Sequence, residues 1–264
     1  MARVIAITNQ KGGVGKTTTS VNLAASLAAT KRRILMIDLD PQGNATMGSG
    51  INKAEVERTA YELLTKKATF DEVVQRSEAG AYDLIPSNGD LVAAEVELLN
   101  EIGREHRLRI ALNTIRQRYD FILIDCPPSL NMLTVNALSA ADGVIIPMQC
   151  EYYALEGLAA LMSTVEQIKE TINPDLSISG ILRTMYDPRN SLTKDVSAEL
   201  EDYFGDLVYK VAIPRNVRLA EAPSHGLPVL HYDKASKGAI AYLALAGEIV
   251  RKTKAENKKV LAEV

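Results

Sequence analysis

Seven short apolar runs alternate along this chain with longer segments whose apolar residues recur at helical spacing. The runs are rich in Ile, Val and Leu at successive positions, which is typical of strands buried on both faces of a parallel sheet. They span residues 3–8, 33–38, 82–87, 121–126, 143–148, 177–182 and 207–214. The helical segments are 16–29, 91–100, 104–118, 131–140, 154–172, 192–204 and 236–253. This alternation predicts an α/β fold, a mostly parallel twisted sheet with helices on both faces.

The chain of 264 residues suits a single α/β domain, 1–264, because no repeat, low-complexity tract or Gly/Ser-rich linker divides it. The first strand begins near residue 3, so we expect no helix-turn-helix domain ahead of it. No window approaches the ~18 apolar residues of a membrane span, and the first residues lack a signal-peptide pattern. Cys126 and Cys150 are too few for a disulfide framework. We therefore expect a cytoplasmic protein with inert, reduced thiols.

A glycine-rich segment with two lysines, QKGGVGKTTT (10–19), follows the first apolar run. It approaches the P-loop pattern G-x-x-x-x-G-K-[ST], with glutamine in place of the first glycine. Its glycines let backbone N–H groups point at phosphate oxygens, and the following helix adds its dipole. Lys16 would reach the β- and γ-phosphates of a nucleotide, and the Thr17 hydroxyl would bind Mg²⁺. The expected nucleotide contacts in this loop are Gly12, Gly13, Val14, Gly15, Lys16, Thr17 and Thr18.

Acidic residues stand at the carboxyl ends of two predicted strands, where ligands bind in open α/β sheets. The segment 34–46, ILMIDLDPQGNAT, carries Asp38 and Asp40, and YDFILIDCPPSL (119–130) carries Asp125. Asp125 has the form of a Walker B acid, which holds Mg²⁺ directly or through water. We expect Asp38 to support the metal shell and Asp40 to position the attacking water. The alternative role of residues 38–46 is an ordinary strand-ending turn.

These segments, together with QCEYYALEGL and IPRNVRLAEAPSHGLPV, resemble the ParA/Soj family of chromosome- and plasmid-partitioning ATPases. The resemblance identifies the loop as a deviant Walker A motif, found also in MinD and the nitrogenase iron protein. It implies that Lys11, a catalytic residue with Lys16 and Asp40, reaches across a nucleotide-sandwich dimer to the ATP of the partner subunit. ATP would then hold a homodimer together, and hydrolysis would loosen it. The alternative for Lys11 is a solvated loop lysine.

The same resemblance implies two further sites. Pro214 and Asn216 should line the adenine pocket, although this stretch alone indicates only a helix N-cap region. The family binds double-stranded DNA without sequence preference, and each basic contact would neutralise one backbone phosphate. A net charge of −3 argues against nucleic-acid binding by a lone subunit, but a dimer doubles the basic surface. The candidate DNA contacts, each individually also compatible with a solvated surface charge, are Arg189, Arg215, Arg218, Lys234 and Lys237.

Two relatives in this class carry features that the sequence lacks. MinD ends in an amphipathic helix that lies on membranes, whereas the tail EIVRKTKAENKKVLAEV has several lysines, and no aromatic residue follows Tyr242. We therefore expect no membrane binding. The nitrogenase iron protein needs cysteines to hold a cluster between subunits, and neither Cys126 nor Cys150 matches those ligands.

The sequence thus predicts an ATPase that uses ATP and Mg²⁺, dimerises with ATP, binds the DNA of the nucleoid and drives chromosome or plasmid partitioning. The resemblance implies that the amino-terminal segment of a ParB-like partner stimulates hydrolysis and resets the dimer. One alternative is a ParA-like positioning ATPase for a cargo other than DNA. Another is a small-molecule P-loop enzyme of the dethiobiotin-synthetase type, which the paired lysines and the segment PRNVRLAEAPSHG disfavour.

Overall fold

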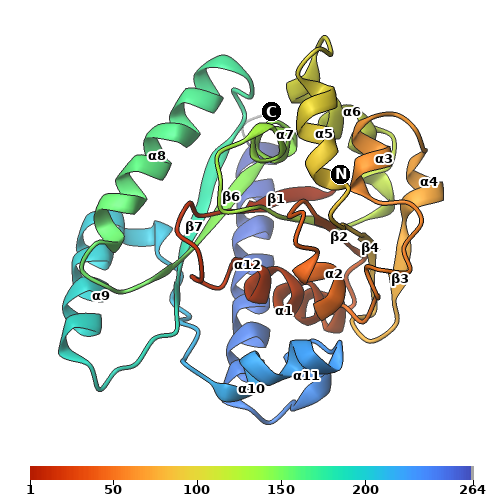
Figure 1. Cartoon of the computed structure of the whole chain (residues 1–264). Helices are drawn as coiled ribbons and strands as arrows, with labels where there is room; N and C mark the ends of the chain where they lie inside the picture. Colours follow the sequence, from red (N-terminus) through yellow and green to blue (C-terminus); the bar gives the residue numbers. More distant parts are fainter. Residues whose placement is uncertain (263–264) are drawn as a thin grey trace.

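The computed structural model describes residues 1–262, with side chains through residue 256, and its strands form one seven-stranded sheet (Figure 1). The strand order is β3-β4-β2-β5-β1-β6-β7, and only the β3–β4 pair is antiparallel. The strands are β1 (Arg3–Ile7), β2 (Ile34–Asp38), β3 (Gln75–Ser77), β4 (Tyr82–Ile85), β5 (Phe121–Asp125), β6 (Gly143–Gln149) and β7 (Ser177–Thr184). The predicted α/β fold with a mostly parallel sheet is confirmed.

Helices connect most of the strands, and α9 to α12 follow the last strand, β7, in the chain. The longer ones are α1 (Lys16–Ala29), α5 (Leu91–Leu98), α7 (Met132–Ala140), α8 (Ala154–Thr171), α9 (Ser191–Phe204) and α12 (Lys237–Ala262). The shorter α-helices are α2 (Asn44–Gly48), α3 (Ala60–Leu64), α4 (Phe70–Val73), α6 (Arg107–Asn113), α10 (Val217–Glu221) and α11 (Val229–Tyr232). The described residues also form four short 3-10 helices: η1 (Arg104–His106), η2 (Arg116–Arg118), η3 (Gly205–Leu207) and η4 (Ala222–His225).

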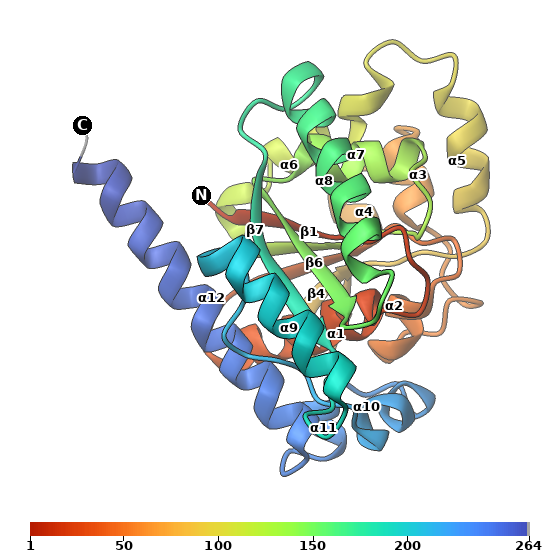
Figure 2. The same ribbon diagram turned by 90° about the vertical axis from the view of Figure 1, so that its left-hand side faces the viewer.

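The sheet is covered on both faces because successive residues of its central strands are apolar. In β1, Val4 and Ala6 pack into one hydrophobic core with residues of α3 and α5 to α9. Ile5 and Ile7 point to the other face and pack with residues of α1 and α12. Figure 2 shows α12 as a long helix running along the outside of this second face. The two cores fix which face each connecting helix covers.

The predicted strand over 207–214 is wrong. The segment follows β7 but makes only two isolated bridges, Ile181 with Val208 and Tyr186 with Pro214. Between them, the amides of Lys210 and Val211 donate to the two carboxylate oxygens of one side chain, Glu248 of α12, at 3.0 and 3.2 Å. The backbone still bonds to β7 through the amides of Tyr209 and Ile213, but at Lys210 and Val211 a carboxylate from the covering helix interrupts a regular strand pairing.

The predicted helix over 104–118 is interrupted, and several short helices and one strand were not predicted. The Oδ1 atom of Asn136 accepts a hydrogen bond from the Leu108 amide (3.1 Å), and its Nδ2 donates to the Arg104 carbonyl (2.8 Å). In a continuous helix these two backbone groups would bind each other. Asn136 thus separates η1 from α6. The unpredicted α-helices and strands are α2 to α4, α10, α11 and the edge strand β3, which are too short to show a clear apolar period.

The order of the sheet decides where the motifs meet. β2, β5 and β1 are neighbours at its centre, and their carboxyl ends carry the two acidic segments and the glycine-rich loop. Within the part of the chain that the structure describes, no helix combines the length and apolar character needed to cross a membrane. The prediction of no membrane binding concerns the carboxyl-terminal tail. The side chains of residues 257–264 in this tail lie outside the described residues.

Candidate nucleotide-binding site

The glycine-rich loop joins β1 to α1 and curls tightly. Gly13 and Gly15 have φ angles of 73° and 87°, in the left-handed region that glycine adopts without steric cost. The loop begins at Asn9, whose Oδ1 accepts a hydrogen bond from the Lys11 amide (3.0 Å). The Nδ2 of Asn9 donates to the Pro147 carbonyl in β6 (2.8 Å). This buried asparagine, which sequence reasoning missed, fixes the start of the loop to the neighbouring strand.

A second contact fixes the far end of the loop. Val14 is buried, and its carbonyl accepts a hydrogen bond from Oγ1 of Thr184, the last residue of β7 (2.8 Å). β7 therefore supports a loop that lies far from it in sequence. Nothing in the local sequence marks Thr184 for this role.

Lys16 lies inside the curl of the loop. Its side chain is 8% exposed, and its Nζ donates to the carbonyl of Lys11 at 3.1 Å. Burial lowers the pKa of this ammonium, while the nearby carboxylate of Asp125 acts in the opposite direction. A phosphate at the loop would add negative charge beside this ammonium and favour its charged form. The position fits the predicted role of Lys16.

Asp125 ends β5 and faces the first turns of α1. Its carboxylate accepts hydrogen bonds from the hydroxyls of Thr17 and Ser20, each at 2.8 Å. These two residues are three apart on α1 and so share a helix face, a spacing that could have revealed Ser20 beside Thr17. Complete burial raises the pKa of Asp125, and the charge of Asp38 raises it further. A cation next to this carboxylate would favour its ionised form.

Asp38 and Asp40 occupy different environments. Asp38 pairs with Asp125 in the register of β2 and β5. Its Oδ2 accepts hydrogen bonds from the amide and the hydroxyl of Thr46, both at 2.8 Å, and its Oδ1 accepts from the Asp40 amide at 3.1 Å. Burial raises the pKa of Asp38. This residue supports the loop that carries Asp40, whose own partly exposed carboxylate accepts from the Gln42 amide (2.9 Å).

Unlike Lys16, Lys11 lies at the surface of the protein. Its side chain is exposed, and its Nζ lies 2.7 Å from Oε2 of Glu151, just before α8. Glu151 is followed by Tyr152 and Tyr153, which are 74% and 72% exposed and pack edge to face. Lys11 thus stands at an outer surface with an acidic partner and two exposed aromatic rings.

A cavity of about 380 Å³ adjoins the loop and brings Pro214 and Asn216 next to Gly15 and Thr18. Asn216 also caps α10, because its Oδ1 accepts from the Arg218 amide at 3.1 Å. The remaining lining residues, which the sequence did not assign to a base pocket, are Thr184, Met185, Ile213, Arg215, Val217, Leu219, Ala220 and Tyr242. A mostly apolar cavity beside the phosphate loop has the character that an adenine ring needs.

The basic residues considered for DNA binding lie on adjoining segments. Arg189 is 89% exposed and pairs with Asp187, with N–O distances of 2.9 and 2.7 Å. The Arg215 amide donates to the Tyr186 carbonyl (3.3 Å), so residues 186–189 lie beside the start of 214–218. Hydrogen bonds from the side chain and the amide of Arg189 lower the pKa of Asp187, and the charges of Arg189 and Arg215 lower it further.

Arg218 connects this region to the next segment. Its guanidinium contacts Glu221 at 2.7 Å and Asp233 at 3.3 Å. Lys234 and Lys237 follow directly and are exposed. We refer to the five cations Arg189, Arg215, Arg218, Lys234 and Lys237 as the basic surface. Acids partly neutralise it, so a DNA phosphate at Arg189 or Arg218 would compete with a carboxylate.

The two cysteines lie in the core. Burial raises the pKa of both thiols, to about 11 for Cys150 and further for Cys126. Both side chains therefore remain protonated near neutral pH, as expected for thiols with a packing role.

The donor set fits magnesium and a nucleotide. Among the described residues, no group of three or more His, Cys, Asp and Glu could hold a metal by itself. Mg²⁺ usually takes one or two protein carboxylates and fills its other positions with phosphate oxygens and water. Thr17 and Asp125 offer this partial set beside the loop, and Lys16 offers charge for the phosphates.

Comparisons with known proteins show the family of this chain. A family model described as an AAA domain matches residues 2–178. The sporulation initiation inhibitor protein Soj of Bacillus subtilis is 54% identical, over 94% of this chain and 98% of Soj. The chromosome partitioning protein ParA of Myxococcus xanthus is 51% identical, over 96% of this chain and 89% of that protein. The chain belongs to the ParA/Soj family of partitioning ATPases.

Solved structures extend the comparison to the ligands. The crystal structure of cobyrinic acid a,c-diamide synthase from Mycobacterium smegmatis, with bound ADP and magnesium, superposes with a TM-score of 0.84. It is 38% identical, and the match covers 96% of each chain. This ParA/Soj-family protein is an ATPase whose cofactors are ATP and Mg²⁺. When bound, Mg-ATP would supply the phosphoryl group that is transferred to water.

Proposed function

We propose that this protein is an ATP-dependent dimeric switch that binds DNA non-specifically and drives chromosome or plasmid partitioning with a ParB-like partner, 1–264 acting as one domain. Lys16, the loop amides and Thr18 bind ATP in this proposal, with Pro214 and Asn216 at the base. Thr17 and Asp125 hold Mg²⁺, and Asp38 supports that shell. Asp40 positions the attacking water.

The separation of the two lysines carries the proposal. Lys16 is buried within its own loop, whereas the Lys11 ammonium points outward to Glu151. A second lysine at the surface beside a phosphate loop is explained if it serves a triphosphate on another subunit. The exposed rings of Tyr152 and Tyr153 beside it would gain from burial at such an interface.

Lys11→Ala tests the dimer. The variant should bind ATP nearly as well as the parent, since Lys16 and the loop amides remain. Light scattering coupled to size exclusion, with a non-hydrolysable ATP analogue, should then show a monomer. The exposed and ion-paired Lys169→Ala serves as a control and should dimerise normally. A Lys11→Ala dimer of parental stability contradicts the role of this lysine.

DNA binding follows from doubling the basic surface. A chain with a net charge of −3 offers few phosphate contacts as a monomer, but two basic surfaces on one duplex act together. We expect binding to two unrelated duplexes with the ATP analogue and little binding with ADP. Equal affinity in both nucleotide states would contradict the switch, and no DNA binding at all would favour a positioning ATPase for another cargo.

The reset step needs a partner. A switch stores its state only if hydrolysis is slow until a signal arrives, so we propose that a ParB-like amino-terminal segment accelerates hydrolysis on the dimer. A synthetic peptide of that segment should raise the steady-state ATPase rate of the parent in the presence of DNA. It should not raise the rate of Lys11→Ala, which lacks the dimer. Stimulation of both proteins alike would contradict a dimer-specific partner.

A further inference from the structure

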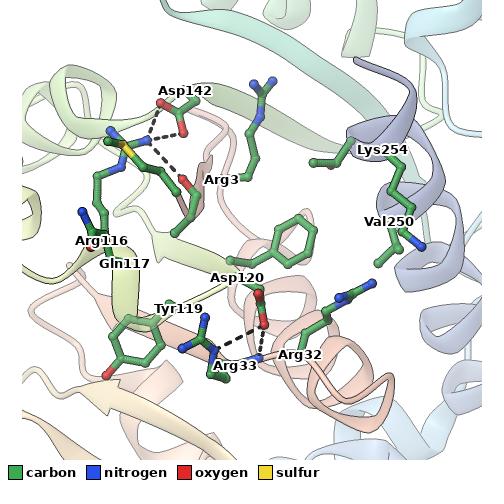
Figure 3. A pocket seen from close by; sticks show the side chains of 14 residues that line it. Arg3, Arg32, Arg33, Arg116, Gln117, Tyr119, Asp120, Asp142, Val250 and Lys254 are labelled. Carbon is green, nitrogen blue, oxygen red and sulfur yellow. Dashed lines mark hydrogen bonds and ion pairs between the residues drawn. The ribbon is translucent and has the colours of Figure 1, made fainter. Parts of the chain in front are cut away.

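A second cavity, of about 780 Å³, lies at the opposite end of the sheet from the nucleotide site (Figure 3). It is lined by Arg3 and Phe121, which begin β1 and β5, and by Arg32 and Arg33, which follow α1. The carboxyl ends of the same strands and the amino end of α1 form the phosphate loop region. The 14 residues of α1 span about 20 Å between the two sites.

The cavity carries a surplus of positive charge. Its lining side chains include five cations, Arg3, Arg32, Arg33, Arg116 and Lys254, and only two carboxylates, Asp120 and Asp142. Glu256 at the margin pairs with Arg3 at 3.4 Å. These cations come from four separate parts of the chain, so no single local pattern explains why they converge.

The two carboxylates are already bound to the backbone. Asp142 accepts a hydrogen bond from the Val4 amide (2.8 Å) and holds Arg116 at 2.6 and 2.7 Å. Asp120 accepts from the Arg33 amide (2.8 Å) and lies 3.7 Å from the Arg33 guanidinium. Both acids thus position arginines on the cavity wall.

Two cations have no such partner. Arg32 and Lys254 form no ion pair and no side-chain hydrogen bond with any residue whose side chain the structure describes. Figure 3 shows them on the same side of the cavity, across from Arg116 and Asp142. The partial negative charge at the carboxyl end of α1 stabilises a cation nearby and so accounts for Arg32. It does not account for Lys254, which comes from α12.

We propose that this cavity is a second anion site, separate from the P-loop, for a small molecule that bears two or more phosphate groups. Its volume lies within the range of small-molecule sites. Guanidinium groups match phosphate oxygens with two parallel hydrogen bonds, and clustered phosphates supply several charges in a small space. A DNA duplex spaces its phosphates along a convex surface, whereas the cations here converge on one cavity.

Equilibrium dialysis with radiolabelled pyrophosphate tests the proposal on the full chain saturated with ADP and Mg²⁺. The parent should bind one pyrophosphate per chain at low salt. The double variant Arg32→Ala/Lys254→Ala should bind it at least about tenfold more weakly, because two charge-assisted contacts are lost. Neither residue is part of the nucleotide site, so the variant should keep the parental ATPase rate and thermal midpoint.

A matched control removes one arginine and one lysine elsewhere. Arg109→Ala/Lys169→Ala, outside the cavity lining, should bind pyrophosphate within about twofold of the parent. Equal weakening in both double variants would overturn the proposal, as would an absence of saturable binding. Release of a fluorescent ADP analogue in step with pyrophosphate binding would assign the ligand to the P-loop instead. Displacement of pyrophosphate by lower concentrations of duplex DNA or a polyglutamate peptide would assign the surface to a macromolecule.

Discussion

The ammonium of Lys11 and the carboxylate of Glu151 lie 2.7 Å apart, although 140 positions separate them in the sequence. The lysine proposed to serve the partner's ATP is therefore paired within its own chain in the monomer. The two groups are about half exposed, so the pair is weak and easily exchanged for a phosphate. If Lys11 serves the ATP of a partner subunit as proposed, Glu151 would compete with that ATP for the lysine.

Glu151→Gln should strengthen the ATP-dependent dimer, because the amide keeps the shape of the side chain but releases the lysine. We expect a dissociation constant up to about fivefold lower, given the small energy of exposed ion pairs. Analytical ultracentrifugation with an ATP analogue measures it. Glu156→Gln, which changes an exposed acid in the first turn of α8, is the control. A weaker dimer in Glu151→Gln would mean that Glu151 contributes to the interface itself.

Lys16→Ala should reduce ATP binding and hydrolysis together, since it removes the one buried cation within the loop. The loss of a charge-assisted phosphate contact should weaken ATP binding about tenfold to a hundredfold. Fluorescent-nucleotide titration reports the affinity, and phosphate release reports the rate. Lys194→Ala, an exposed lysine on α9, should match the parent. Parental hydrolysis by Lys16→Ala would refute the assignment of the P-loop.

Asp40→Ala should slow ATP hydrolysis without weakening ATP binding. Its carboxylate is partly exposed and is not buried against the loop like Asp125. We expect ATP affinity close to the parental value, a persistent ATP-bound dimer and hydrolysis slowed ~100-fold or more. Asp90→Ala, another exposed acid, should hydrolyse ATP normally. An Asp40→Ala protein that stays monomeric with ATP would show that this acid has a structural role.

Arg189→Glu and Arg218→Glu should each weaken binding to all duplexes alike while leaving ATP-dependent dimerisation intact. Each dimer loses two phosphate contacts, so the log–log slope of affinity against salt should fall by about two units. Salt titrations on two unrelated duplexes give this slope. Arg58→Glu is a close control, because Arg58 is as exposed as Arg218 and is also ion-paired. A change in preference between the duplexes would indicate base contacts.

Asn173→Ala should destabilise the fold without touching the site. The buried Nδ2 donates to the carbonyls of Leu138 and Ala141 at the end of α7 (2.8 and 2.7 Å). Leaving these two acceptors unpaired should cost about 2–4 kcal/mol of unfolding free energy. Urea unfolding at 25 °C measures the change. The exposed Asn113→Ala should stay within about 0.5 kcal/mol of the parent, and an equal effect would contradict the burial argument.

The sequence by itself determined the parallel sheet, the phosphate loop and the positions of Asp38 and Asp125, because each depends on residues close together in the chain. Apolar periodicity identifies strands, and the carboxyl ends of neighbouring parallel strands meet at one edge. Ser20 was within reach of the same reasoning, since it lies three residues from Thr17 on one helix face.

Only the tertiary structure decided the contacts between distant segments. Glu248 binds two amides in the middle of the predicted strand 207–214, and Asn136 divides the predicted helix over 104–118. The pairing of Lys11 with Glu151 and the convergence of Arg32 and Lys254 also depend on how α8 and α12 pack against the sheet. Local pattern specifies which face of an element is buried, but it does not specify which side chain of a remote element will meet it.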